Sequence, residues 1–158
     1  MSLGLYLHIP YCFSKCRYCD FYSHPGERGV PEAYVDALLR ELSRFAPEAP
    51  LQPDTLYFGG GTPSLLRPEQ AKRLIDAARP MPGAEITLEA NPETVTEESL
   101  AGFREAGVNR ISFGVQSARD TQLRTLGRPH TAKQARAAFA AARRAGFANI
   151  SGDIMLAL

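Results

Sequence analysis

The sequence lacks an excess of charge of either sign. Its 158 residues include 18 Lys and Arg against 17 Asp and Glu, which gives a formal net charge of +1. A broad basic surface that would attract nucleic acid or an anionic membrane is therefore missing. This balance argues against a nucleic-acid-binding protein and, in particular, against an enzyme that modifies tRNA.

Long apolar runs are missing as well. No stretch approaches the roughly 18 consecutive apolar residues of a transmembrane helix, and the N-terminus has no charged stretch followed by an apolar signal core. We therefore expect a cytoplasmic protein. Because 44% of its residues are hydrophobic, the chain can nevertheless bury the core of one domain.

Cysteine is scarce and confined to one segment. The three cysteines, Cys12, Cys16 and Cys19, all lie within eight residues. An odd number of closely spaced cysteines is a poor framework for structural disulfides. The spacing therefore favours metal or redox chemistry.

Short runs of alternating apolar and polar residues are separated by helical patterns, which is typical of βα units around a parallel sheet. The pattern predicts five strands, at Leu3–Ile9, Thr55–Phe58, Glu85–Glu89, Arg110–Val115 and Asn149–Ile154. It predicts helices at Pro31–Phe45, from Pro68 onward, from Thr94 or Thr96 to Gly107, at Arg119–Leu126 and from Thr131 to Gly146. We therefore expect a single α/β domain.

Several predicted strands have one apolar face and one polar or small face. In the fourth, Ile111 and Phe113 alternate with Ser112 and Gly114. If helices cover the apolar faces, the polar faces line a lumen that holds a polar ligand. An open sheet with one solvent-exposed face fits the same pattern.

The cysteine loop follows the first predicted strand at its C-terminal end, where α/β folds carry their chemistry. Three thiolates can ligate three irons of a [4Fe-4S] cubane and leave the fourth iron open. S-adenosylmethionine (SAM) can bind that iron through its amino and carboxylate groups and accept an electron at its sulfonium. A zinc site completed by His8 or His24, and ordinary buried cysteines, are the alternatives, although a second pair of zinc ligands is missing.

Glycines and polar residues end the other predicted strands. Gly59-Gly60-Gly61-Thr62 follows the second strand, where glycines let the backbone approach a ligand closely. Glu89, Gln116 and Asp153 lie at or just beyond the ends of the third, fourth and fifth strands. Each of the three has an alternative role in a turn or cap. Their convergence with the cysteine loop at one edge of the sheet predicts a shared binding site.

Five motifs follow one another along the chain. They are Tyr6-Leu-His8-Ile-Pro10-Tyr-Cys12 with Cys16, Cys19 and Asp20-Phe21; Gly59-Gly-Gly-Thr62-Pro-Ser64; Glu89-Ala-Asn91-Pro92; Asn109-Arg-Ile-Ser-Phe-Gly114-Val-Gln116-Ser117; and Gly127-Arg128-Pro-His130. In this order they resemble the oxygen-independent coproporphyrinogen III oxidase family of the radical SAM superfamily. Within that family the chain looks more like the haem chaperone branch than like the true oxidases.

The resemblance implies an α/β fold, namely a partial radical SAM (β/α) TIM-like barrel. Members of the family combine this barrel with a separate C-terminal region. Residues 1–158 would then be the N-terminal part of the barrel, truncated after about the fifth strand. The remainder of the barrel and the C-terminal domain would be absent from this chain.

The resemblance also implies a role for particular residues. Cys12, Cys16 and Cys19 match the cluster ligands, and Tyr18 matches an aromatic position that covers the cluster. The positions that match residues around SAM are Tyr6, Gly60, Glu89 and Asp153. Further SAM-contacting positions, some of which serve a second SAM in the true oxidases, are matched by Gly61, Thr62, Gln116 and Arg128.

The sequence departs from the true oxidases at Phe21, where they carry an additional cysteine. A phenyl ring cannot relay a proton or a thiyl radical, so this departure argues against coproporphyrinogen decarboxylation. The ring can instead pack against a ligand or fill the core behind the cluster.

The function implied by the resemblance is that of a cluster- and SAM-binding haem chaperone. Such a protein binds haem or porphyrin, delivers haem to proteins of the respiratory chain, and meets a membrane only through those partners. A coproporphyrinogen III oxidase is the alternative. Whether SAM is cleaved stays open at this point.

Overall fold

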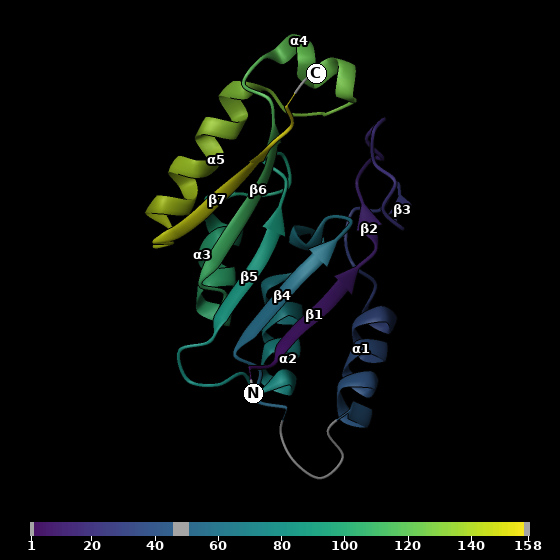
Figure 1. Ribbon diagram of the computed structural model, residues 1–158, viewed down its shortest axis with the longest axis vertical. Helices are drawn as coiled ribbons and strands as arrows, with labels where there is room; N and C mark the ends of the chain where they lie inside the picture. The colour runs from purple at the N-terminus through teal and green to yellow at the C-terminus, as the bar shows by residue number, and fades with distance from the viewer. Residues whose placement is uncertain (1, 46–50, 157–158) are drawn as a thin grey trace.

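A parallel sheet forms the centre of the computed structural model, which describes residues 2–45 and 51–156. Its five strands run in the order β1-β4-β5-β6-β7 (Figure 1). They are β1 (Gly4–Ile9), β4 (Thr55–Gly60), β5 (Glu85–Ala90), β6 (Arg110–Gln116) and β7 (Asn149–Ile154). Because each predicted strand is present within two residues of its expected bounds, the predicted α/β fold is confirmed.

Helices connect the strands, and most of them pack against one face of the sheet. They are α1 (Glu32–Phe45), the 3₁₀ turn η1 (Pro63–Leu65), α2 (Pro68–Ala78), α3 (Glu97–Ala106), α4 (Asp120–Leu126) and α5 (Ala132–Arg144). The side chain of Thr131 accepts a hydrogen bond from the backbone N–H of Gln134, so the predicted cap of α5 is present. No helix within the described residues is long and apolar enough to cross a bilayer.

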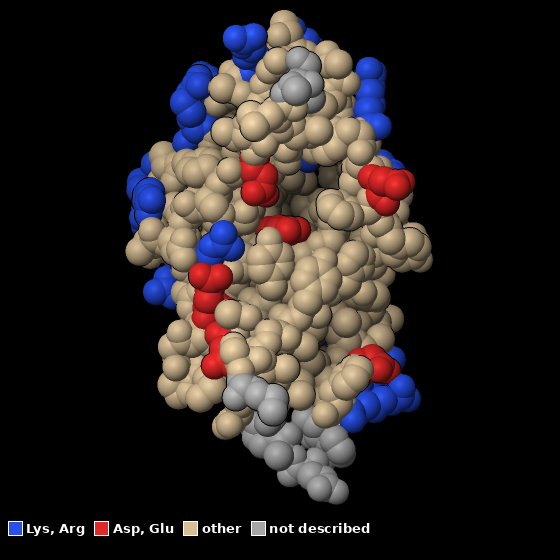
Figure 2. Space-filling model, in the orientation of Figure 1, with Lys and Arg blue, Asp and Glu red and all other residues tan. Residues whose placement is uncertain are grey.

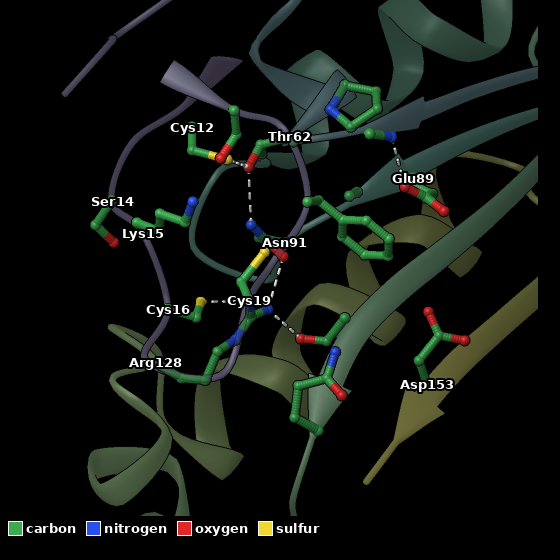
Figure 3. A pocket seen from close by; sticks show the side chains of 18 of the residues that line it. Cys12, Ser14, Lys15, Cys16, Cys19, Thr62, Glu89, Asn91, Arg128 and Asp153 are labelled. Atoms are coloured by element: carbon green, nitrogen blue, oxygen red, sulfur yellow. Dashed lines mark hydrogen bonds between the residues drawn. The ribbon is translucent and has the colours of Figure 1, made fainter. Parts of the chain in front are cut away.

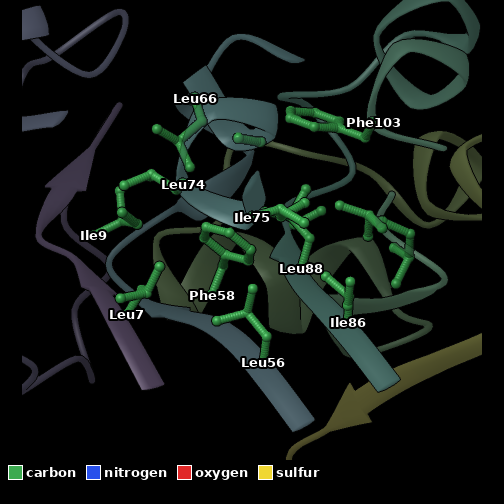
Figure 4. Close-up of a cluster of buried hydrophobic side chains, with 14 of the residues drawn as sticks. Leu7, Ile9, Leu56, Phe58, Leu66, Leu74, Ile75, Ile86, Leu88 and Phe103 are labelled. Carbon is green, nitrogen blue, oxygen red and sulfur yellow. The ribbon is translucent and has the colours of Figure 1, made fainter. Parts of the chain in front are cut away.

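The hydrophobic core lies between the sheet and its helices (Figure 4). From the strands it takes Leu7, Ile9, Leu56, Phe58, Ile86, Leu88, Ile111 and Phe113, and from the helices Leu74, Ile75, Leu100 and Phe103. Each fully buried aliphatic or phenyl side chain of this kind stabilises the fold by roughly 1.5 to 3 kcal/mol. The apolar strand faces are therefore the ones that the helices cover.

Polar side chains occupy the opposite face of the sheet. Arg110 donates to the hydroxyls of Thr87 and Ser151, at 3.3 and 3.0 Å, and Ser151 donates to the hydroxyl of Ser112 at 2.9 Å. Thr87 and Ser112 are buried although they are polar. Because these hydroxyls bond to one another, this face is built to remain polar.

A second, two-stranded sheet lies in the cysteine loop and was not expected from the sequence. It pairs β2 (Tyr11–Cys12) with β3 (His24–Pro25) in parallel. Strands of two residues have no readable alternation, and this pairing joins segments that lie apart in the sequence.

Candidate functional site

The cysteine loop and the C-terminal ends of the strands surround one pocket, with about 740 Å³ of empty space that opens to solvent. Figure 2 shows a hollow on this face of the molecule with acidic side chains beside it. The predicted site residues that line the pocket are Cys12, Cys16, Tyr18, Cys19, Gly60, Gly61, Thr62, Glu89, Gln116, Arg128 and Asp153. The structure therefore brings together residues from every strand connection at one opening of the molecule.

Tyr6 is the one predicted site residue outside the pocket lining. Its ring stacks on Tyr57 with the centroids 6.0 Å apart, and its hydroxyl lies 3.2 Å from Nδ1 of His8. Tyr6 lies on the open polar face of the sheet, where 54% of it is exposed. Its predicted contact with SAM stays a prediction.

Backbone hydrogen bonds hold the cysteine loop in place. The N–H of Arg17 donates to Leu126 at the end of α4, at 3.0 Å, and the N–H of Cys19 donates to Cys16 at 3.1 Å. On the other side of the loop, Glu27 donates to the carbonyl of Cys12 at 3.1 Å. The loop is thus anchored at both sides by main-chain groups, and its three cysteines are free thiols.

All three thiols line the pocket. Among residues 2–45 and 51–156, no three His, Cys, Asp or Glu side chains converge closely enough to hold a single metal ion. Thiolates that ligate three different corners of a cubane lie farther apart than the ligands of one ion. Three thiols from one loop are the protein ligands that a cubane with one open iron takes, so this donor set fits an iron-sulfur cluster.

A chain of hydrogen bonds connects two of the thiols through side chains from three other segments (Figure 3). Thr62 donates to Sγ of Cys12 at 3.6 Å, and the amide nitrogen of Asn91 donates to the Thr62 hydroxyl at 3.1 Å. Arg128 donates through Nη2 to the amide oxygen of Asn91 at 2.6 Å. Through Nη1 it donates to Sγ of Cys16 at 3.2 Å. Asn91 therefore couples both ends of the network.

Asn91 was not singled out as a site residue from the sequence, although it belongs to the Glu89-Ala-Asn91-Pro92 motif. The sequence feature that could have marked Asn91 as a site residue is its position directly after a predicted strand and before a proline. Its role depends on Arg128, which lies 37 positions away, and no local pattern contains that information.

Glycine is required at two points where the backbone lies against this network. A Cβ on Gly61 would lie 2.7 Å from the carbonyl oxygen of Tyr11 and 2.9 Å from Sγ of Cys12. A Cβ on Gly114 would lie 2.8 Å from Nη2 of Arg128. Any larger residue would displace a thiol or the guanidinium.

Arg128 is buried, and its Nε has no hydrogen-bond partner among the described residues. Burial lowers the pKa of Arg128, but its hydrogen bond to Cys16 and the nearby groups of Tyr18 and Glu93 raise the pKa by more, so the guanidinium stays charged. A buried cation with a free donor suits an anionic ligand such as a carboxylate. The donor set therefore fits the amino-acid moiety of SAM as well as the cluster.

Two carboxylates lie across the pocket from the cysteine loop. Glu89 accepts hydrogen bonds from the Tyr57 hydroxyl at 2.7 Å and from the N–H of Gly60 at 3.3 Å. Burial, followed by this hydrogen bond, raises the pKa of Tyr57, so Tyr57 remains a donor. Asp153 accepts from Ser112 at 3.5 Å. Because neither carboxylate is paired with a cation among the described residues, both can accept hydrogen bonds from a ligand.

Two further lining residues are distinctive, Gln116 in its backbone conformation and Tyr18 in the pKa of its hydroxyl. Gln116 adopts a left-handed backbone with φ of 64°, next to an irregularity in the pairing of β6 with β7. Such strain is costly and is concentrated at functional sites. Tyr18 is half-buried, and burial raises the pKa of its hydroxyl to about 12, so it is neutral at physiological pH.

Phe21 lines the same pocket and is 69% exposed. The interpretation in which Phe21 fills the core behind the cluster is therefore wrong. Within residues 2–45 and 51–156, its ring is not part of the hydrophobic core cluster. The interpretation in which Phe21 faces a ligand is the one that fits its position.

The radical SAM superfamily model matches residues 6–158, and the chain belongs to that superfamily. Membership implies a [4Fe-4S] cluster and SAM. The predicted superfamily and the predicted radical SAM fold are thus confirmed.

Among curated proteins, the chain is 43% identical to the heme chaperone HemW of Escherichia coli, and the match covers 97% of this chain and 42% of that protein. It is 41% identical to HemW of Bacillus subtilis, over 97% of this chain and 42% of that protein. It is also 40% identical to the mitochondrial radical S-adenosyl methionine domain-containing protein 1 of Bos taurus, over 98% of this chain and 36% of that protein. The chain thus spans less than half the length of these relatives.

Among solved structures, the fold is similar to coproporphyrinogen III oxidase (HemN) from Escherichia coli, a radical SAM enzyme. The TM-score is 0.86 at 31% identity, and the match covers 97% of this chain and 37% of that one.

Proposed function

We propose that this protein is a haem chaperone that binds a [4Fe-4S] cluster and SAM. The observation that carries the proposal is the pocket in which three free thiols, a buried arginine and two carboxylates meet. Support for the haem-related part comes from the 43% identity to a protein named heme chaperone HemW.

Within this proposal, Cys12, Cys16 and Cys19 hold the cluster. When bound, the cluster supplies an open iron and one electron. Thr62 and Arg128 donate hydrogen bonds to the ligating sulfurs, which orients the thiolates and stabilises their negative charge.

The remaining lining residues would bind SAM. Arg128 would pair with its carboxylate, and Glu89 and Asp153 would accept hydrogen bonds from its amino and ribose hydroxyl groups. Gly60 and Gly61 line the pocket beside these residues.

Phe21 supports the chaperone over the oxidase. Its exposed ring adds apolar area beside the pocket, which suits the flat apolar body of a porphyrin. It offers neither a thiol nor an acidic proton to an oxidative decarboxylation. We propose that haem is the bound ligand and that it passes in the cytoplasm to haem proteins of the respiratory chain, with membranes met only through those partners.

The test is anaerobic reconstitution of the protein, followed by three assays. We expect stoichiometric iron and sulfide, binding of haemin, and no protoporphyrinogen from coproporphyrinogen with SAM and a strong reductant. Analysis of 5′-deoxyadenosine in the same mixture reports whether SAM is cleaved. Product formation at about 1 s⁻¹, or even about a hundredth of it, would overturn the chaperone proposal in favour of the oxidase.

A further inference from the structure

The segment that follows the cysteines presents exposed aromatic side chains to solvent. Phe21 is 69% exposed and Tyr22 is 71% exposed. These two side chains are neighbours in the sequence, and exposed aromatic rings are what a flat apolar ligand packs against. His24 lies in this surface, with its ring centroid 5.3 Å from that of Tyr22 and 6.0 Å from that of Tyr11.

The three histidines of the chain differ in what their rings already bind. His130 is buried, with its two nitrogens 3.0 Å from Glu93 and 3.1 Å from the carbonyl of Val115. Both nitrogens of His8 are 3.2 Å from partners, namely the Tyr6 hydroxyl and the Tyr22 carbonyl. The ring of His24 is exposed and makes no hydrogen bond with any described residue.

The backbone of His24 is fixed even though its ring is free. Its N–H donates to the carbonyl of Pro10 at 2.6 Å, and β3 pairs His24 with Tyr11. Two residues later, the N–H of Gly26 donates to Phe13 at 3.2 Å. A ring held on a rigid backbone loses little entropy when it binds a ligand, which favours ligation.

We propose that His24 is an axial ligand of the haem iron, an inference that rests on the haem-binding function proposed above. Haem iron takes its axial ligands from His, Cys, Met or Tyr. The cysteines here are the predicted cluster ligands, and both other histidines would have to break hydrogen bonds first. His24 offers a free imidazole between two aromatic rings that can pack on a porphyrin face.

This position sets the haem beside the cluster pocket. Phe21 and Ser23, the neighbours of Tyr22, line that pocket, and the segment is paired to Cys12 through β2 and β3. The two sites therefore share one loop.

The experiment is a titration of haemin into the cluster-loaded protein. The Soret band is followed in difference spectra against the same protein without haemin, so that the absorbance of the cluster is subtracted. The cluster absorbs more weakly than haem in this region. His24→Ala should lower haemin affinity by at least about tenfold, which is the lower end of the losses in affinity found when residues of a metal site are mutated. It should also shift the Soret band. Added imidazole should restore the band in His24→Ala. His24→Phe, which keeps an aromatic ring but no nitrogen, should bind weakly and resist this rescue.

Iron and sulfide content and the thermal unfolding curve of each variant show that the loop is intact. If the wild-type protein binds no haemin, the proposed function and this inference both fail. If the wild type binds and His24→Ala binds with the same affinity and the same band, only the inference fails. If Tyr22→Phe loses the Soret band of bound haemin while His24→Ala keeps it, the ligand of the haem iron is the Tyr22 tyrosinate. That result would overturn the role of His24.

Discussion

The two faces of the five-stranded sheet are built from different kinds of side chain, although the same strands supply both. On the helix-covered face, Leu88 of β5 is fully buried in the core. One residue further along, Glu89 turns to the other side and lines the pocket. Alternation along a strand thus separates the residues that hold the fold from those that form the site. Substitutions on the two faces should have separable effects.

The largest expected effect lies at the cysteine loop. Cys16→Ala removes one of three thiolates, so the protein should lose its cluster completely while its far-ultraviolet circular dichroism stays unchanged. Iron and acid-labile sulfide are measured after anaerobic reconstitution. Ser43→Ala, an exposed position on α1, is the control and should load normally. Iron at wild-type stoichiometry in Cys16→Ala would rule out its role as a ligand.

The next effect lies on the helix-covered face. Leu88→Ala leaves a cavity in a packed core, so the free energy of unfolding should fall by about 2 to 5 kcal/mol. Urea denaturation measures the change. SAM affinity of the folded protein should stay near its wild-type value. A variant that is as stable as the wild type would mean that this face is less tightly packed than the structure has it.

Glu89→Ala changes the neighbouring position on the opposite face. Loss of a carboxylate acceptor should weaken SAM binding by about 1 to 3 kcal/mol and leave the iron content unchanged. Calorimetry under argon gives the affinity, and Asp153→Ala should behave alike. Glu85→Ala, at the other end of β5 and outside the pocket lining, is the matched control. Equal affinities for Glu89→Ala and Glu85→Ala would contradict the placement of SAM.

The smallest effect is expected from Asn91→Leu. The substitution breaks the hydrogen bonds to Thr62 and Arg128, each worth about 0.5 to 1.5 kcal/mol, so the donors to Cys12 and Cys16 lose their orientation. We expect the cluster to assemble with a shifted midpoint potential, measured by redox titration with electron paramagnetic resonance.

Asn109 is the matched control for Asn91. It bonds to the backbone of Ile86 and Ala84, each at 2.8 Å, near the N-terminal end of β5. Asn109→Leu should therefore lower stability without moving the potential. Identical potentials in wild type and Asn91→Leu would show that the network does not tune the cluster.

The sequence predicted most of the fold, because its elements carry local signals. Pro68 opens α2 and Thr131 caps α5 where the pattern places them. The pairing of β2 with β3 was not predictable, since two-residue strands have no alternation. Ile154, at the end of β7, is 66% exposed, so alternation along a strand does not by itself show whether an apolar residue is covered.

The candidate site was predictable to a similar degree. Cys12, Cys16 and Cys19 are close in sequence, so their spacing alone indicated a cluster. Arg128 lies 112 positions from Cys16, and its place beside the thiol rested on resemblance to a family. The role of Asn91 follows only from the three-dimensional network, since its partners come from two other segments.

The way the cysteine loop is anchored bears on how such proteins diversify. Backbone hydrogen bonds of Arg17, Cys19, His24 and Glu27 hold it, and none of these bonds uses the side chain of Phe21. Evolution can therefore exchange residue 21 without disturbing the loop that carries the thiols. A change from thiol to phenyl at that one position alters what the pocket presents to its ligand while the inherited scaffold stays the same. Residue 21 can therefore differ without a change in these backbone hydrogen bonds of the loop.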